Sequence, residues 1–321
     1  SVSRRPGVAA RRRPGAPSTT GDRPMLDPKN NYIRLYHNAK RLAWDPARLD
    51  LSQDAESWQR IVREHPEERY AEQLLLYLSL FDAGEVAVTQ TLSPFLGAIA
   101  RAGLGLEREI FLTTQLLEEA KHTEFFRRYH AEVLGEGVAL PPLPGDAHRV
   151  LVSELDAIAD ALRREDDPTT LRALLVQGVT HYMGVVEGTL GRTAYQVAHT
   201  ALGQRGWLPG LRHALRLIRR DEGRHIGFGI QFVRDLVAMD RAYRPSVERT
   251  FRRFLPLVEQ TVRAFDFPHR LVDENPLPAV ARDAYWQFAA LRHQRSRAAV
   301  PERALALQAP VLQAPVLTSV P

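Results

Sequence analysis

Apolar side chains recur every three or four residues along most of the chain from about residue 66, which is the spacing of one face of an α-helix. No stretch alternates convincingly with a period of two, so strands are not expected. Glycine and proline divide the pattern into segments that span residues 65–103, 104–137, 148–166, 168–202, 209–239, 245–266 and 278–295, with a turn at 141–146. Long helices joined by short connections predict an all-α protein organised as an antiparallel bundle.

The two ends of the chain differ from this pattern. Residues 1–24 contain six arginines and one aspartate, and we expect them to form a disordered basic tail. Residues 297–321 repeat LQAPV, and their prolines exclude a helix, so this end is expected to be a flexible tail. The sequence therefore predicts a single helical domain over residues 25–296.

Composition excludes several classes of function. Beyond residue 24 the chain balances 37 basic against 37 acidic groups, so its net charge of +5 gives little support for nucleic-acid binding. The absence of cysteine excludes disulfides, thiolate zinc sites and iron–sulfur clusters, so any metal must be held by oxygen and imidazole nitrogen. With no apolar run of about 18 residues and no apolar stretch near the start that is typical of a secretory signal, a cytoplasmic protein is expected.

The segment LLEEAKHTEFF places ionisable groups on the buried face of a predicted helix. On helical spacing Glu119 and His122 share a face with Leu112 and Phe126, whereas Glu118 falls elsewhere on the wheel. A core helix would carry apolar residues at positions 119 and 122. A single Glu-x-x-His pair is common on helices and does not by itself predict a metal site.

A second pair, Glu222 and His225, occurs about 100 residues later in RRDEGRHIGFG, again in phase with apolar side chains. Two more long helices each contain an isolated glutamate, Glu85 and Glu187, within an apolar stretch. Each alone could be a structural charge with a partner. Four inward carboxylates, however, would repel one another and would cost several kcal/mol each if they were left unpaired.

Two divalent metal ions balance four carboxylates and leave two neutral imidazoles as further ligands. The order Glu, Glu-x-x-His, Glu, Glu-x-x-His on four long helices is that of the di-metal carboxylate proteins of the ferritin-like class. Carboxylate oxygens with one imidazole per metal favour iron or manganese over zinc or copper. Asp221 is a candidate acceptor for a hydrogen bond from a ligating imidazole, namely that of His122. Alternatively, Asp221 is exposed and forms an ion pair with Arg219 or Arg220.

The motifs EEAKH, VEGTL and DEGRH, in their order and separation, resemble the ribonucleotide reductase small-subunit superfamily over about residues 66–236. The resemblance implies a ferritin-like four-helix bundle core that is extended by additional helices, and a homodimer. Reductase subunits usually carry a radical-storing tyrosine one turn after the first histidine ligand, and Phe126 stands at that position here. The last residues also lack the acidic and aromatic side chains with which those subunits dock their partner.

The sequence is more similar to the ligand-binding oxidases of this superfamily, which hold a manganese–iron cofactor and a long-chain fatty acid. Those proteins form an ether cross-link between a valine three residues after the first glutamate ligand and a tyrosine five residues before the third. Val88 and Tyr182 occupy these two positions. Simple core packing is the alternative explanation for this pair, and a radical-generating reductase subunit with a manganese–iron or di-iron centre is the alternative function.

The resemblance implies an oxidase that uses dioxygen for two-electron C–H oxidation. Glu85, Glu119 and His122 would hold one metal. Glu187, Glu222 and His225 would hold the other, and Glu119 and Glu222 would bridge the two metals. A fatty-acid tail would lie near apolar residues such as Val86, Met183, Val185 and Val186. Two other functions use comparable features, namely an iron-storage shell and a lipid carrier with a structural metal.

Overall fold

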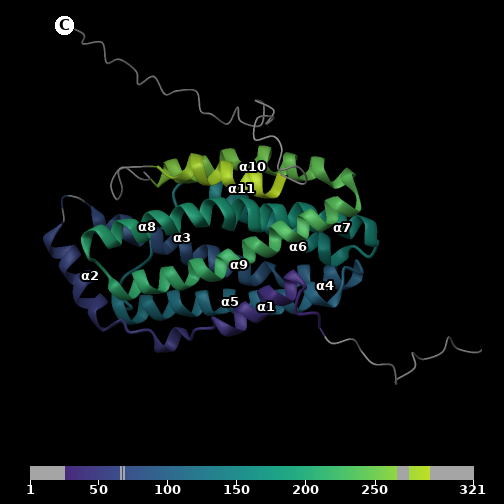
Figure 1. Cartoon of the computed structure of the whole chain (residues 1–321). Helices are drawn as coiled ribbons and strands as arrows, with labels where there is room; N and C mark the ends of the chain where they lie inside the picture. The colour runs from purple at the N-terminus through teal and green to yellow at the C-terminus, as the bar shows by residue number, and fades with distance from the viewer. Residues whose placement is uncertain (1–25, 66, 68, 266–274, 290–321) are drawn as a thin grey trace, which may run out of the picture.

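The computed structural model describes residues 26–65, 67, 69–265 and 275–289, and these residues form helices without any strand. Figure 1 shows the long helices lying side by side. The predicted all-α, ferritin-like bundle is therefore confirmed. The predicted tails, 1–24 and 297–321, lie outside the described residues, as do residues 290–296 at the end of the predicted domain.

Four helical elements form the core of the bundle. The first is α3 (Tyr70–Thr91) and the second is α5 (Leu106–Tyr129). The third is a continuous run of α7 (Pro168–Val179), the π-helix η3 (Thr180–Gly191) and α8 (Arg192–Arg205). The fourth is α9 (Pro209–Met239). α3 packs on α5, and η3 packs on α9, so all four elements surround one interior.

Shorter elements cover this core. They are α1 (Asn31–Arg41), η1 (Pro46–Arg48), α2 (Ser52–Glu64), α4 (Ser93–Arg101), η2 (His130–Leu134), α6 (Ala147–Arg164), η4 (Arg241–Tyr243), α10 (Arg244–Ala264) and α11 (Leu277–Ala289). α1 packs along α5, while α10 and α11 pack on η3 from another side (Figure 1). The core elements are therefore covered by protein on more than one face.

A buried carboxylate joins α2 to the start of α9. Asp54 accepts hydrogen bonds from the backbone N–H groups of Gly210 and Leu211, at 2.7 and 2.8 Å, and from the Tyr129 hydroxyl at 3.1 Å. The first N–H groups of a helix have no partner within the helix, so a carboxylate that accepts from them stabilises its start. This contact fixes α9, which carries two of the predicted metal ligands.

The structure corrects several predicted helix boundaries. The segment expected at 65–103 begins as a helix only at Tyr70 and breaks at Leu92, because Pro94 has no N–H group to donate to the carbonyl of Gln90 four residues earlier. The segment expected at 104–137 changes from α- to π-helix after Tyr129. The helices α1 and α2 lie before residue 66, where no helix was expected.

Candidate metal centre

The six predicted ligands come together in the interior of the bundle. Glu85 comes from α3, Glu119 and His122 from α5, Glu187 from η3, and Glu222 and His225 from α9, and all six side chains are buried. They form two overlapping groups, within each of which one donor atom per residue lies within 4.8 Å of the others. Glu119 and Glu222 belong to both groups, which is the arrangement that bridging ligands require.

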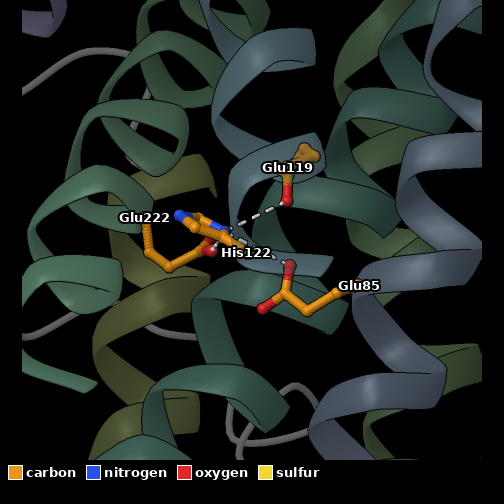
Figure 2. A group of neighbouring side chains, drawn as sticks. All are labelled: Glu85, Glu119, His122 and Glu222. Carbon is orange, nitrogen blue, oxygen red and sulfur yellow. Dashed lines mark hydrogen bonds and ion pairs between the residues drawn. The ribbon is translucent and has the colours of Figure 1, made fainter. Parts of the chain in front are cut away.

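The first group is centred on the His122 imidazole. Its Nδ1 atom lies 3.2 Å from Glu85 Oε2, 3.5 Å from Glu119 Oε2 and 3.4 Å from Glu222 Oε1. Figure 2 shows the three carboxylates directed at this ring from three different helices. One nitrogen and several oxygens therefore converge on a space that a single cation can fill.

The second group repeats this geometry around His225. The Nδ1 atom of this imidazole lies 3.0 Å from Glu119 Oε1, 3.5 Å from Glu222 Oε2 and 3.6 Å from Glu187 Oε1. The two imidazole rings are 6.2 Å apart between centroids. The two halves of the site are thus related by an approximate symmetry, as the repeated Glu-x-x-His pattern in the sequence suggests.

The outer nitrogen of each imidazole faces an acid. His122 Nε2 lies 3.4 Å from Asp221 Oδ2, and His225 Nε2 lies 2.9 Å from Glu118 Oε2. An acid at this position fixes the ring orientation and leaves Nδ1 free for a metal. Asp221 therefore lies beside His122, and its charged partners in the described part of the chain are Arg224 and Lys121 rather than Arg219 or Arg220.

Glu118 is a site residue that the helical-wheel analysis missed. Its side chain is buried and bonds both His225 and Arg224, which also reaches Asp221 at 2.5 Å. Burial alone raises the pKa of Glu118, but the hydrogen bond and charge of His225, helped by Arg224, hold this pKa below its ordinary value. Glu118 and Asp221 thus form one buried ionic network around the two imidazoles.

The inner carboxylates carry unusual pKa values. Burial raises the pKa of Glu85 to about 7, although His122 opposes this rise, and burial together with Glu222 raises the pKa of Glu187 well above its ordinary value. Burial also raises the pKa of Glu222, with the charge of Glu119 adding to the effect. Without a metal, protons must therefore neutralise part of this cluster.

Several buried polar atoms of the cluster have no hydrogen-bond partner. They are the Oε2 atoms of Glu119, Glu187 and Glu222, and the Nδ1 atom of His225. Such orphan atoms are rare in protein interiors because each costs its full desolvation free energy. Glu119 Oε2, Glu222 Oε2 and His225 Nδ1 are among the atoms that converge in the two groups, so the residues present fit a pair of cations with oxygen and imidazole ligands.

Local backbone geometry places Glu187 in the centre. This residue lies in the π-helix η3, in which Thr189 Oγ1 donates to the carbonyl of Gly184 five residues earlier at 2.9 Å. A Cβ atom on Gly188 would lie 2.6 Å from the carbonyl oxygen of Met183, so only glycine fits there. π-helical turns occur frequently at functional sites.

Tyr182 contacts Glu119, and Val88 lines a cavity that Glu119 also lines. The Tyr182 hydroxyl donates to Glu119 Oε1 at 2.8 Å, and both side chains are buried. Val88 lines an apolar cavity of about 80 Å³ that Glu85, Glu119 and Glu222 also line. Of the apolar residues expected near a ligand tail, only Val186 lines this cavity, and Met183 and Val185 are instead buried elsewhere in the core.

The structure is similar to several solved structures of metal-containing proteins. A variant of an R2-like ligand-binding oxidase with a glycine-to-phenylalanine substitution and an anaerobically reconstituted Mn/Fe cofactor shares 27% identity, at a TM-score of 0.73 over 84% of this chain and 96% of that one. A valine-to-isoleucine variant shares 28% identity at a TM-score of 0.74. A third structure, of a glycine-to-leucine variant at 28% identity, holds a non-activated Mn/Mn cofactor. No protein-family model matches the sequence.

The chain has the fold of R2-like ligand-binding oxidases. The resemblance predicted from EEAKH, VEGTL and DEGRH is confirmed, because the similarity spans 95% or more of those three chains. The similar proteins are metal-dependent oxidases, which is the class of enzyme that the sequence predicts. The predicted manganese–iron cofactor agrees with the Mn/Fe cofactors in those structures.

Proposed function

We propose that the protein is a di-metal oxidase whose centre holds manganese and iron, or two irons, between the six buried ligands. Glu85, Glu119 and His122 would hold one ion, and Glu187, Glu222 and His225 would hold the other; Glu119 and Glu222 belong to both groups. The observation that carries this proposal is the convergence of these six buried side chains in two overlapping groups, which include donor atoms without a hydrogen bond. When bound, the metal pair supplies the activation of dioxygen for two-electron oxidation.

The protein's own residues prepare this chemistry. Asp221 and Glu118 hold the imidazoles in the orientation that presents Nδ1 to the centre. The buried position of the six ligands keeps bulk water away, which strengthens each electrostatic interaction at the site. The Tyr182 hydroxyl, buried and bonded to Glu119, stays protonated at neutral pH, because burial and the nearby carboxylates raise its pKa well above the ordinary value.

We further propose that Val88 and Tyr182 become covalently linked. The Cβ–H bond of Val88 and the O–H bond of Tyr182 break, a Cβ–O bond forms, and dioxygen accepts the two electrons and two protons that are released. The hydrogen bond from Tyr182 to Glu119 and the cavity that Val88 and Glu119 both line support this proposal. Ordinary core packing would also place both side chains in the interior, so a covalent test is needed.

Mass spectrometry provides that test. Metal-free protein is loaded with Mn(II) and Fe(II), exposed to air, digested and searched for a peptide that joins Val88 to Tyr182 with a loss of two hydrogens. The Tyr182→Phe variant is the matched control, because it removes the hydroxyl and keeps the ring. Separate peptides from a chain that holds both metals would contradict the cross-link and leave the metal centre intact.

The ligand is proposed to be a fatty acid whose carboxylate lies near the metals and whose tail enters the apolar cavity. Apolar lining residues support this, but about 80 Å³ is less than the roughly 150 Å³ of an apolar cavity that holds benzene. A long chain would therefore have to enlarge the cavity. Organic extraction of the purified protein followed by mass spectrometry should recover a stoichiometric fatty acid, and extracts without one would contradict this assignment.

One observation favours the alternative, a radical-generating reductase subunit. The Trp44 indole donates to Asp221 Oδ2 at 2.7 Å, and Asp221 in turn contacts His122, so a hydrogen-bonded chain leads from the centre to a partly exposed aromatic ring. Such a series of hydrogen-bonded side chains can carry an electron. Addition of a reductase large subunit should yield ribonucleotide reduction if this function holds, and the oxidase proposal predicts none.

We also propose a homodimer. Leu106 and Leu117 are 58% and 62% exposed and lie about three helical turns apart on α5, so they share one face of that helix. Exposed apolar side chains on one face are typical of contact surfaces. Size-exclusion chromatography with light scattering should give twice the mass of one chain, whereas a large shell would support iron storage instead.

A further inference from the structure

A second cavity lies beside the metal centre, and its character is polar. It has a volume of about 350 Å³ and is lined by residues of α8, α9 and α11. Tyr195 and Glu222 line both this cavity and the apolar one, so these two residues lie between them. The volume falls within the roughly 300–1,000 Å³ of pockets that bind small molecules.

Two arginines give this cavity a positive charge. Arg219 makes no hydrogen bond or ion pair with any residue in the described part of the chain, and Arg192 contacts only Asp283, at 3.3 Å with both side chains partly exposed. Partial burial and the neighbouring charge of Arg192 lower the pKa of Arg219. The two guanidinium groups therefore repel each other, and no carboxylate among the described residues forms an ion pair with Arg219.

Neighbouring groups add to this charge. His199 on α8 has its pKa lowered by partial burial and then by Arg219, Arg212 and Arg216, and no carboxylate opposes this effect. These arginines place several positive charges along α8 and α9, on the side that includes the cavity wall at Arg219. Such a region attracts anions and concentrates them at the site.

Two glycines form part of the cavity wall where a larger residue would fit. Gly223 and Gly227 lie within α9, and each costs about 1 kcal/mol of helix stability relative to alanine. A Cβ atom at Gly223 would have no neighbour within 4 Å, and at Gly227 the nearest atom would be Leu35 Cδ2 at 3.9 Å. Packing within the protein does not require glycine at either position, whereas a ligand that contacts the α9 backbone would.

We propose that this cavity binds a small organic anion whose carboxylate or phosphate group is held by Arg219 and Arg192. Guanidinium groups suit both kinds of head group because their N–H donors match two oxygens at once. The inner wall at Glu222 places the remainder of the ligand next to the proposed metal centre. Because Glu222 is itself acidic, the anion should bind more tightly once metals neutralise this carboxylate, and only that expectation rests on the proposed function.

Isothermal titration calorimetry of the metal-free full chain tests the site directly. Inorganic phosphate and succinate are titrated separately at low ionic strength, where at least one should bind with a 1:1 stoichiometry and a Kd of about 1 mM or tighter. Arg219→Ala should weaken this binding about tenfold or more. Arg249→Ala, at an exposed position of α10 without a hydrogen bond or ion pair to a described residue, should leave the binding unchanged.

A second variant separates binding from folding. Gly223→Ala should weaken anion binding because the methyl group enters the cavity, and the same change should raise the Tm because alanine favours the helix. Binding of succinate alone identifies a carboxylate ligand, and binding of phosphate alone identifies a phosphate ligand. The proposal is overturned if neither probe binds up to about 10 mM, or if both Arg219→Ala and Gly223→Ala bind as the unmodified chain does.

Discussion

At the scale of single residues, each imidazole is oriented by an acid on the helix that carries the other Glu-x-x-His pair. His122 contacts Asp221, which precedes Glu222, and His225 contacts Glu118, which precedes Glu119. The helical wheel assigned Glu118 to another face, which was expected to lie outside the site. That face is covered because α5 packs on α1, α3 and α9, and α1 was not predicted. A helical wheel that assumes a single buried face misassigns residues on a helix that is buried on several faces.

Replacement of Glu118 by glutamine should weaken metal binding about 10- to 100-fold, because the acid that orients His225 loses its charge. The six ligands themselves remain. Competitive titration with a chromogenic chelator measures this affinity for each metal. Glu124→Gln, an exposed position on the same helix, is the control and should match the unmodified chain. An unchanged affinity in Glu118→Gln would exclude the orienting role.

His181 should make the fold sensitive to acid. Its Nε2–H donates to the carbonyl of Leu151 at 2.9 Å, its Nδ1 has no partner, and burial lowers its pKa to about 4. The unfolded chain takes up this proton near pH 6.5, and the folded chain does so only near pH 4, so the free energy of unfolding falls as the pH drops through this window. The expected loss between pH 7 and pH 5 is about 2 kcal/mol.

Urea unfolding of metal-free protein at the two pH values measures this contribution. His181→Gln cannot take up the proton, so its loss of stability should be smaller than that of the unmodified chain by about 2 kcal/mol. The exposed His213→Gln variant should retain the full loss. Equal losses in all three proteins would show that His181 does not govern the acid response.

At the scale of elements, the sequence predicted the long core helices because their apolar spacing and their glycine and proline boundaries are local signals. α1 and α2 were missed, although Asn30 caps α1 by accepting from the N–H groups of Tyr32 and Ile33. The change from α- to π-helix within residues 168–202 was also missed, because both helix types share nearly the same apolar pattern over a few turns. The π-helix becomes apparent only in three dimensions, for example in the close approach of Gly188 to the Met183 carbonyl five residues earlier.

Substitution of Gly188 by alanine should disrupt η3. The new Cβ atom would lie 2.6 Å from a backbone carbonyl that cannot move without breaking the helix, so we expect a loss of about 1–3 kcal/mol in the free energy of unfolding. The metal content should fall as well, because Glu187 is the preceding residue. Gly191→Ala is the control, since its Cβ atom would lie 3.4 Å from the nearest atom.

Urea unfolding and metal analysis of the two variants are the measurements for this element. A Gly188→Ala protein as stable and as rich in metal as Gly191→Ala would show that the site does not depend on the π-helix.

At the scale of the whole molecule, the bundle encloses a cluster of carboxylates and imidazoles that is unfavourable without cations. The order of these residues along four helices was sufficient to predict that they meet, because a bundle with short connections has few possible arrangements. The order could not predict the two cavities, which depend on side chains from α8 and, in the polar cavity, on one from α11, none of which belongs to a distinctive motif. Across the described residues, no helix has the length and apolar content that a membrane crossing requires.

The most direct test of the central claim combines metal analysis with oxygen uptake. Metal-free protein is loaded anaerobically with Mn(II) and Fe(II), freed of excess metal, analysed for both elements, and mixed with air-saturated buffer in an oxygen electrode. We predict about two metal ions per chain and rapid oxygen uptake, both strongly reduced in Glu119→Gln and unchanged in Glu124→Gln. One metal or none per chain, or two metals without oxygen uptake, would contradict the account.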